Sequence, residues 1–372
     1  MQCTKMVQRK ERLFIAKQEF LTIKIDYISI VFDTATAEEV IRRVLELPVD
    51  IFDIQSAKVQ HKSYQSVYAI GSIKVFGNAK KNEDNPFGLG SYLVLSGMGC
   101  DEIFRILDMH GQSFGDLFKR CERWFCGKFH FTRLDIAIDD RNEVPYFTIK
   151  QLKRKCEREE YIANSNTHRF NESKYEDYNT AKTVYIGAGK SGMSYRFYDK
   201  DKEVSMKHEK PMDDIGSWKR TEMQLRDEKA HSFAMLFKDN PFDLGKLAFD
   251  LLAGSLRFVV PDKTQSNKSR WKTCRFWKRF LGAVEPLKLH VETPHNTLLE
   301  TQRWLKEGGV LSAVKAFHFL EVHQALGDLE RVEDMLKQVR YSAKLGNKLT
   351  GHLCKIHREE LIPHVQYDTK KG

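Results

Sequence analysis

The stretch FHFTRLDIAID (129–139) alternates between apolar and polar residues with a period of two, which predicts a β-strand. Three later runs show the same alternation: KTVYIG (182–187), MSYRFYDK (193–200) and WKRTEMQLR (218–226). Successive side chains of a strand point to opposite faces, so each run divides into an apolar row and a polar row. Together they predict a sheet in the middle of the chain with one apolar face.

Strands and helices also alternate on the N-terminal side of this sheet. The expected strands are IDYISIVFD (25–33), VYAIGSIKVFG (67–77) and GSYLVLSGMGC (90–100), and the expected helices are ATAEEVIRRVLELP (35–48), which Pro48 ends, and a segment over about 101–127. The glycines Gly97 and Gly99 are expected at turns that need unusual backbone angles. The polar stretch NSNTHRFNESKYEDYNT (164–180) is predicted to be a loop.

After about residue 230 the strand patterns fade and helical periodicity takes over. The fold class predicted is therefore α+β: an antiparallel-sheet core with packed helices, followed by a helical C-terminal region. We expect an N-terminal α/β region over 1–115, a catalytic sheet domain over 116–232 and a helical DNA-binding region over 233–372.

Composition limits the class of protein. The 372 residues are 41% hydrophobic, which is enough for real cores and excludes a disordered chain. No apolar run reaches about 18 residues, so no membrane span is expected. The first residues lack the apolar core of a secretory signal and the seven cysteines are sparse, so a reduced, cytoplasmic protein is expected. The formal net charge of +10 points to an anionic partner, with nucleic acid first.

The polar rows of three strands hold side chains that could carry chemistry. They are Arg133, Asp135 and Asp139 in the first, Arg196, Tyr198 and Lys200 in the second, and Arg220, Glu222, Gln224 and Arg226 in the third. One explanation is a half-solvated sheet whose outer face is polar by default. The other is a metal-dependent phosphodiester site, in which carboxylates hold a hard cation, a phenol attacks, and Lys and Arg steady the phosphate.

The combination of motifs resembles a known family. FTRLDIAIDD (131–140), then YIG (185–187), RFYDK (196–200) and WKRTEMQLR, is similar to the trans-acting rolling-circle initiator family (Rep_trans). LVLSGMGC (93–100) and the Arg- and Trp-rich run LRFVVPDKTQSNKSRWKTCRFWKRFLG (256–282) add to the resemblance, which covers about 25–305. The family comprises plasmid initiators, filamentous-phage initiators and relaxases of integrative conjugative elements.

The resemblance implies a site and a mechanism. Tyr198 would attack a DNA phosphodiester, giving a 5′-phosphotyrosyl enzyme and a free 3′-OH, and reversal would rejoin the strand. Asp135 and Glu222 would bind Mg²⁺ or Mn²⁺. Asp139 is a weaker metal candidate, because four residues along a strand span about 13 Å from Asp135. A phenol has a pKa near 10, so Lys200 and Arg196 are expected to stabilise its ionised form.

The function expected is a replication initiator that nicks and religates one strand at an origin to start rolling-circle replication of a phage or plasmid. A conjugative relaxase acting at a transfer origin is the alternative with the same chemistry. A non-enzymatic DNA-binding protein is the alternative of another class. The resemblance also implies supercoiled or single-stranded origin DNA, a host helicase and a host polymerase as partners, and a homodimer.

The segment 262–288 concentrates positive charge, with eight basic residues and two acidic ones. Aromatic residues are interleaved, which is typical of an amphipathic helix whose basic face is free to follow phosphates. The residues expected to bind DNA are Arg133, Arg226, Lys268, Arg270, Lys272, Arg275, Lys278 and Arg279.

Two competing motifs are set aside. Tyr195 lies three residues before Tyr198, but the alternation places it on the apolar face, where packing is expected. GAGKS (187–191) lacks the first glycine of a P-loop and precedes a strand, so a hairpin turn is expected there.

Overall fold

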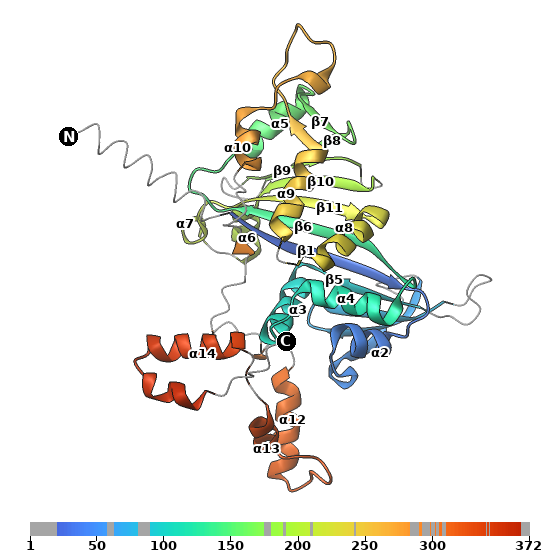
Figure 1. The fold of residues 1–372 in the computed structure, drawn as a ribbon, viewed down its shortest axis with the longest axis vertical. Helices are drawn as coiled ribbons and strands as arrows, with labels where there is room; N and C mark the ends of the chain where they lie inside the picture. Colours follow the sequence, from blue (N-terminus) through green and yellow to red (C-terminus); the bar gives the residue numbers. More distant parts are fainter. Residues whose placement is uncertain are drawn as a thin grey trace. The chain divides into compact units, whose positions relative to one another are not determined.

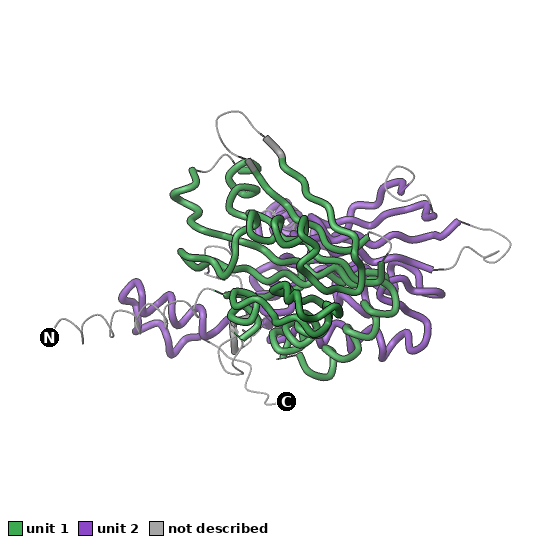
Figure 2. The backbone as a smooth tube through the Cα atoms, turned by 90° about the horizontal axis from the view of Figure 1, so that it is seen from above, with its two compact units in different colours: residues 1–26, 132–292 green, residues 27–131, 293–372 purple. Residues whose placement is uncertain are grey.

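The computed structural model describes most of the chain beyond residue 20. The described residues are 21–57, 63–80, 90–174, 180–188, 191–208, 211–241, 243–282, 290–291, 298, 302, 305–306, 310–339, 341 and 343–365. The chain forms two compact units: unit 1 is residues 1–26 with 132–292, and unit 2 is residues 27–131 with 293–372 (Figure 2). Each unit thus combines two separate stretches of sequence, and the division at 115/116 and 232/233 stays a prediction.

Unit 1 is built on a sheet with the strand order β1-β6-β11-β10-β9-β8 (Figure 1). Their bounds are β1 Leu21–Phe32, β6 Phe129–Asp140, β11 Lys219–Arg226, β10 Met193–Asp199, β9 Thr180–Ile186 and β8 His168–Lys174. β11 pairs antiparallel with both β6 and β10, and β9 pairs antiparallel with β10 and β8. β13 (His290–Val291) adds to β1 in parallel, and β7 (Tyr161–Ala163) pairs separately with β12 (Leu256–Phe258). The antiparallel core is therefore confirmed.

Helices cover the apolar face of the unit 1 sheet. They include α5 (Ile149–Glu157), α8 (Asp227–Asp239), α9 (Leu244–Ser255) and α10 (Arg275–Leu281). Phe197 of β10 points to this side, with its ring centroid 5.9 Å from that of Phe147 and 6.2 Å from that of Trp277. Phe280 extends the cluster to Phe249 of α9 at 5.4 Å. This aromatic core fixes α5 and α10 on the face opposite the polar row. The short elements α6 (Lys200–His208), α7 (Met212–Ile215) and η3 (Lys268–Arg270) complete the unit.

The strand order in unit 2 is β2-β3-β4-β5-β1. The strands are β2 Asp53–Ser56, β3 Tyr64–Ile70, β4 Ile73–Ala79 and β5 Ser91–Leu95. The helices are α2 Ala37–Val40, η1 Ile41–Leu45, η2 Val49–Ile51, α3 Gly97–Met109 and α4 Phe114–Phe125, and, in the C-terminal segment, α12 Val310–Val322, α13 Val332–Gln338, α14 Ala343–Lys355 and η4 Glu359–His364. The helical C-terminal region is thus confirmed.

Four sequence expectations about local structure are wrong. The strand expected over 67–77 is two strands, β3 and β4, which pair antiparallel on either side of a turn at Gly71 and Ser72. The stretch 164–180 contains β8, which pairs with β9 along its length; a polar edge strand has no apolar row, so its pattern resembles a loop. The helix over 101–127 is two helices, α3 and α4. Gly97 and Gly99 lie in the first turn of α3 and are not among the glycines with positive φ. Gly99 is needed for close approach, because a Cβ there would lie 2.6 Å from the carbonyl oxygen of Ser72.

Candidate active site

The polar rows of β6, β11 and β10 meet in register on one face of the unit 1 sheet. Across β6 and β11, Arg220 lies opposite Asp139 and Gln224 lies opposite Asp135. Across β11 and β10, Glu222 lies opposite Arg196 and Arg220 lies opposite Tyr198. Directly opposed side chains in an antiparallel pair are close enough to interact, so the sheet assembles these groups by itself.

This polar face is not solvated where these groups lie. Tyr198 is 4% exposed, Asp135 is 5% exposed and Glu222 is 8% exposed. A row of charged groups at this depth costs free energy unless every member has a partner. The half-solvated sheet is therefore wrong as an explanation of the pattern at these positions.

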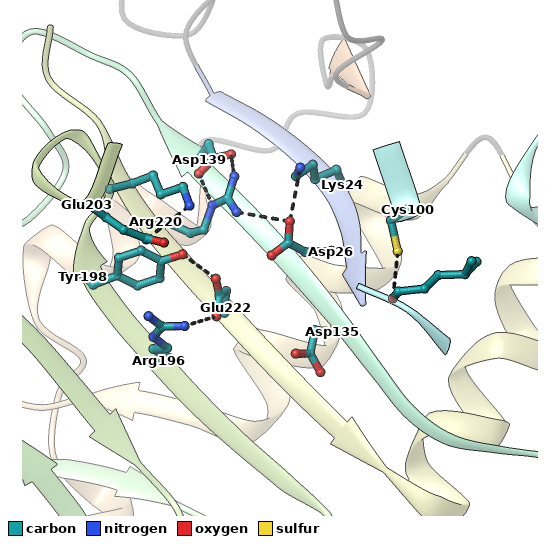
Figure 3. Close-up of polar contacts among 12 residues, drawn as sticks. Lys24, Asp26, Cys100, Asp135, Asp139, Arg196, Tyr198, Glu203, Arg220 and Glu222 are labelled. Atoms are coloured by element: carbon teal, nitrogen blue, oxygen red, sulfur yellow. Dashed lines mark hydrogen bonds and ion pairs between the residues drawn. The ribbon is translucent and has the colours of Figure 1, made fainter. Parts of the chain in front are cut away.

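Tyr198 makes a short hydrogen bond to a carboxylate. Its hydroxyl donates to Oε1 of Glu222 at 2.5 Å (Figure 3). The Arg196 guanidinium carbon lies 4.2 Å from the phenol ring centroid, and Nζ of Lys200 lies 5.7 Å from it. Burial, together with the negative charge of Glu222, raises the pKa of Tyr198 far above its usual value near 10. The phenol is held neutral and hydrogen-bonded.

Lys200 reaches the site from a helix. β10 ends at Asp199 and Lys200 begins α6, so the expectation that it shares the strand face is wrong. Its ammonium donates to Oε2 of Glu203 at 3.1 Å. It still lies near the Tyr198 ring, as described above.

The two expected metal ligands each face an arginine. Arg133 binds Asp135 through two hydrogen bonds of 2.9 and 2.5 Å, and Arg196 lies 3.4 Å from Oε2 of Glu222. Burial raises the pKa of Asp135 and of Glu222, and the negative charge of Asp26 adds to both shifts, while the arginines oppose them. The two carboxylates are therefore in electrostatic contact with a third, Asp26.

Asp139 is committed to a different partner. Its carboxylate, 1% exposed, accepts two hydrogen bonds from Arg220 at 2.7 and 2.6 Å. Arg220 also reaches Oδ1 of Asp26 at 3.1 Å. Arg220 thus supplies the positive charge that a buried aspartate requires.

Asp26 of β1 is the acidic group that sequence reasoning missed. Burial acts to raise its pKa, but Arg220 and Lys24 outweigh it and the net pKa is lowered. Figure 3 shows Asp26, Asp135 and Glu222 on neighbouring strands of this face. In the sequence, Asp26 is visible only as a polar residue in the alternating run IDYISIVFD. Its place beside β6 follows from the strand order, which the sequence does not show.

The donor chemistry of this face fits a hard divalent cation. Carboxylate oxygens are what Mg²⁺ and Mn²⁺ prefer, and burial, which raises the pKa of Asp135 and of Glu222, leaves these oxygens with little water around them. Within the described ranges no three His, Cys, Asp or Glu side chains are arranged as a ready-made metal site. Cation binding would therefore require the arginine partners to shift.

Tyr195 lies where the alternation predicted. It is 3% exposed and stacks on Phe197 with ring centroids 6.5 Å apart, on the apolar face. The turn between β9 and β10 is confirmed as a hairpin connection rather than a P-loop.

The expected DNA-binding residues fall into two groups. Arg133 and Arg226 lie opposite each other on β6 and β11, and Arg226 donates to Oε1 of Gln224 at 2.9 Å. The others lie around η3 and α10, which pack on the apolar side of the sheet: Lys268, Arg270, Lys272, Arg275, Lys278 and Arg279. The structure does not bring this second group to the face of Tyr198.

Two further expectations concern the whole chain. No helix in the part that the structure describes is long and apolar enough to span a membrane. The described cysteines are all free thiols.

The chain is similar to proteins that handle DNA. A family model described as "Replication initiation factor" (Rep_trans) matches residues 129–336, and one described as "Rolling Circle replication initiation protein N-terminal domain" matches residues 22–120. A "Putative DNA relaxase NicK" of Bacillus subtilis (strain 168) is 29% identical over 339 residues, which cover 90% of this chain and 91% of the relative. A solved rolling-circle replication initiator protein from Geobacillus stearothermophilus has 26% sequence identity and a TM-score of 0.59, covering 73% of this chain and 98% of that one.

Proposed function

The chain belongs to the replication initiation factor family, and we propose that it nicks and religates one strand of origin DNA with Tyr198 as the nucleophile. The family and both relatives support DNA nicking, and the two family models and the solved initiator support nicking that starts replication. The observation that carries the assignment to Tyr198 is its buried hydroxyl, hydrogen-bonded to Glu222 and flanked by Arg196 and Lys200.

The proposed step exchanges one phosphodiester for another. Oη of Tyr198 attacks the phosphorus, the bond from phosphorus to the 3′ oxygen breaks, and the phenol proton ends on the leaving 3′ oxygen. In the resting site Tyr198 keeps that proton and donates it in a hydrogen bond to Glu222. Arg196 and Lys200 are placed to neutralise the phosphate charge. Reversal of the same step religates the strand.

We propose Asp135 and Glu222 as the ligands of Mg²⁺ or Mn²⁺, with Asp26 as the third carboxylate. The cation would polarise the scissile phosphate and favour the phenolate. Asp139 is assigned to Arg220 instead, because both of its oxygens are used in that pair. The oxygen donors and their mutual electrostatic influence support this set.

A conjugative relaxase is the second candidate. It is favoured by the relative named as a putative relaxase, whose match extends over nine-tenths of this chain. The chemistry at Tyr198 is the same in both, so the two functions differ only in the DNA site that is nicked. The genes beside the coding sequence indicate which site that is: transfer genes favour the relaxase, and capsid or plasmid replication genes favour the initiator. A host helicase, a host polymerase and a homodimer stay predictions.

The nucleophile is tested by incubating supercoiled plasmid that carries the cognate origin with the Tyr198→Phe variant and Mg²⁺. We expect loss of nicking by roughly 10³-fold or more, because phenylalanine has no group that could attack. Binding to the same DNA should be retained. Tyr195→Phe is the matched control and should nick as the wild type does. Nicking by Tyr198→Phe at the wild-type rate would refute the assignment.

Metal dependence is tested with Asp135→Asn and with removal of divalent cations by a chelator. Both should abolish cleavage while the affinity for origin DNA stays within about two-fold, since phosphate contacts rather than the cation dominate binding. Titration of Mn²⁺ into the protein, followed by its electron paramagnetic resonance signal, should show weaker binding by Asp135→Asn. Cleavage that survives chelation would remove the cation from the mechanism.

A further inference from the structure

A basic surface lies on the opposite side of the unit 1 sheet from Tyr198. Phe197 and Tyr198 are consecutive in β10, so their side chains point to opposite faces. Phe197 packs on Phe147 and Trp277, which hold α5 and α10 on its side. We propose that α5 and α10 form a docking site for the phosphate backbone of duplex DNA, separate from the catalytic face. The inference rests on the proposed function for the identity of the polymer.

The two helices enclose an open pocket of about 550 Å³. Its polar lining comes from both: Gln151 and Lys155, one turn apart on α5, and Arg275 and Arg279, one turn apart on α10. Residues four apart lie on the same side of a helix, so each helix directs one polar edge to the pocket. Neither helix alone would make it.

The charged residues of these helices are mostly basic. α5 (IKQLKRKCE) has four basic residues and one acidic residue, and α10 (RFWKRFL) has three basic residues and none that is acidic. Lys155 is already used, because its ammonium donates to Glu160 at 2.6 Å and to the carbonyl of Val259 at 3.0 Å. Lys153 lies 3.5 Å from Glu157.

Among the basic residues that line the pocket, Arg275 and Arg279 are left for a ligand. Both are exposed, and neither has an ion-pair partner among the described residues. Arg279 lies 6.0 Å from the ring of Tyr146, a contact that leaves its N–H groups available. A guanidinium presents donors in the geometry that phosphate oxygens accept. With Gln151 beside them, they suit successive phosphates of a backbone.

The aromatic residues decide between duplex and single-stranded DNA. Proteins that hold single strands stack bases on exposed aromatic rings. Trp277 is 0% exposed and Phe280 is 1% exposed, so both rings belong to the core. Phe276, which lines the pocket, is half-buried and packs on Phe147, Phe258 and Trp277. The exposed polar groups of the pocket are the two guanidinium groups, which fits a duplex held by its phosphates without reading of bases. The surface would hold a DNA segment other than the strand being cleaved.

The test measures binding of a fluorescent duplex of about 25 base pairs and arbitrary sequence, without divalent cations, over a range of salt. The double variant Arg275→Ala with Arg279→Ala should lose affinity, and the slope of log K against log salt should fall in magnitude by about two, near one for each phosphate contact. Lys119→Ala with Lys128→Ala removes the same charge from exposed positions of unit 2 and should leave the slope unchanged. The double variant Arg275→Lys with Arg279→Lys keeps both positive charges and should restore most of the affinity and of the salt slope.

Cleavage of a single-stranded oligonucleotide that spans the cognate nick site gives the second readout. The arginine double variant should cleave it at the wild-type rate, because the pocket lies away from Tyr198. An unchanged salt slope would overturn the docking site, and so would a parallel loss of oligonucleotide cleavage. If the wild type fails to cleave at all, the proposed function fails while the duplex result still decides on this surface.

Discussion

The contact between Tyr198 and Glu222 defines the protonation state of the proposed nucleophile. A phenol at 2.5 Å from a buried carboxylate keeps its proton, and its pKa lies above the usual value because burial and Glu222 both disfavour the phenolate. In the proposed mechanism, added positive charge is needed to form the phenolate. Arg196, which contacts both groups, is the nearest fixed cation.

That raised pKa has a consequence for stability at high pH. A group whose pKa is higher in the folded state stabilises the fold fully below its unfolded value, here about 10, and loses that contribution as the pH rises through the folded value. Relative to Tyr198→Phe, the wild type should lose about 0.8 kcal/mol of unfolding free energy between pH 8 and pH 10.5. Urea unfolding of both proteins at the two pH values measures it. A difference that is constant or grows with pH would show that the phenol ionises normally.

One buried ion pair joins β6 to β11. Arg220 is 4% exposed and binds both oxygens of Asp139, and it also reaches Asp26 on β1. Removing one partner leaves an uncompensated buried charge, so Arg220→Ala should lower the unfolding free energy by roughly 3–5 kcal/mol. Urea unfolding at pH 7 measures this loss.

Two further variants serve as controls for the predicted loss of stability in Arg220→Ala. Arg226→Ala is the matched control on the same strand. It should cost under about 1 kcal/mol, because Arg226 is half-buried and its side chain, among the residues that the structure describes, binds only the neutral Gln224. Arg220→Met with Asp139→Leu should recover much of the loss, since apolar replacements of similar volume remove both charges. A small effect of Arg220→Ala would mean that Asp139 has another cation.

Alternation along the strands was enough to predict which side chains share a face. It placed Tyr198 with Arg196 and Tyr195 with Phe197, because a period of two is a local property of the backbone. It did not predict the burial of the polar face or the partner of Asp139, because both depend on which strands are neighbours. Asp26 was missed for the same reason, since β1 lies far away in the sequence.

Local sequence patterns also gave wrong predictions where tertiary contacts determine the structure. β8 has a polar sequence and is a strand because β9 supplies its hydrogen bonds. Glycine is required at position 99 because the carbonyl oxygen of Ser72, in the hairpin before α3, approaches it closely. No local sequence pattern predicts this contact. The family motifs were informative because they combined residue types at fixed spacings along several strands.

The unit 1 sheet separates two kinds of positive charge. On one face Arg133, Arg196 and Arg220 neutralise buried carboxylates, so they contribute little net charge to the surface. On the other face the basic residues of α5 and α10 lie on exposed sides of their helices. Together these two helices carry seven basic residues and one acidic residue. We propose that one face of the sheet cuts a strand while the other holds the duplex.

The identity of the nucleophile can be read directly from a covalent product. The protein is incubated with Mg²⁺ and an oligonucleotide spanning the cognate nick site, then digested with trypsin and analysed by mass spectrometry. Trypsin cuts after Arg196, so Tyr195 and Tyr198 fall on different peptides. We predict that the nucleotide is attached to the peptide FYDK, on Tyr198. Attachment to the peptide that contains Tyr195, or cleavage without any covalent product, would contradict the proposed mechanism.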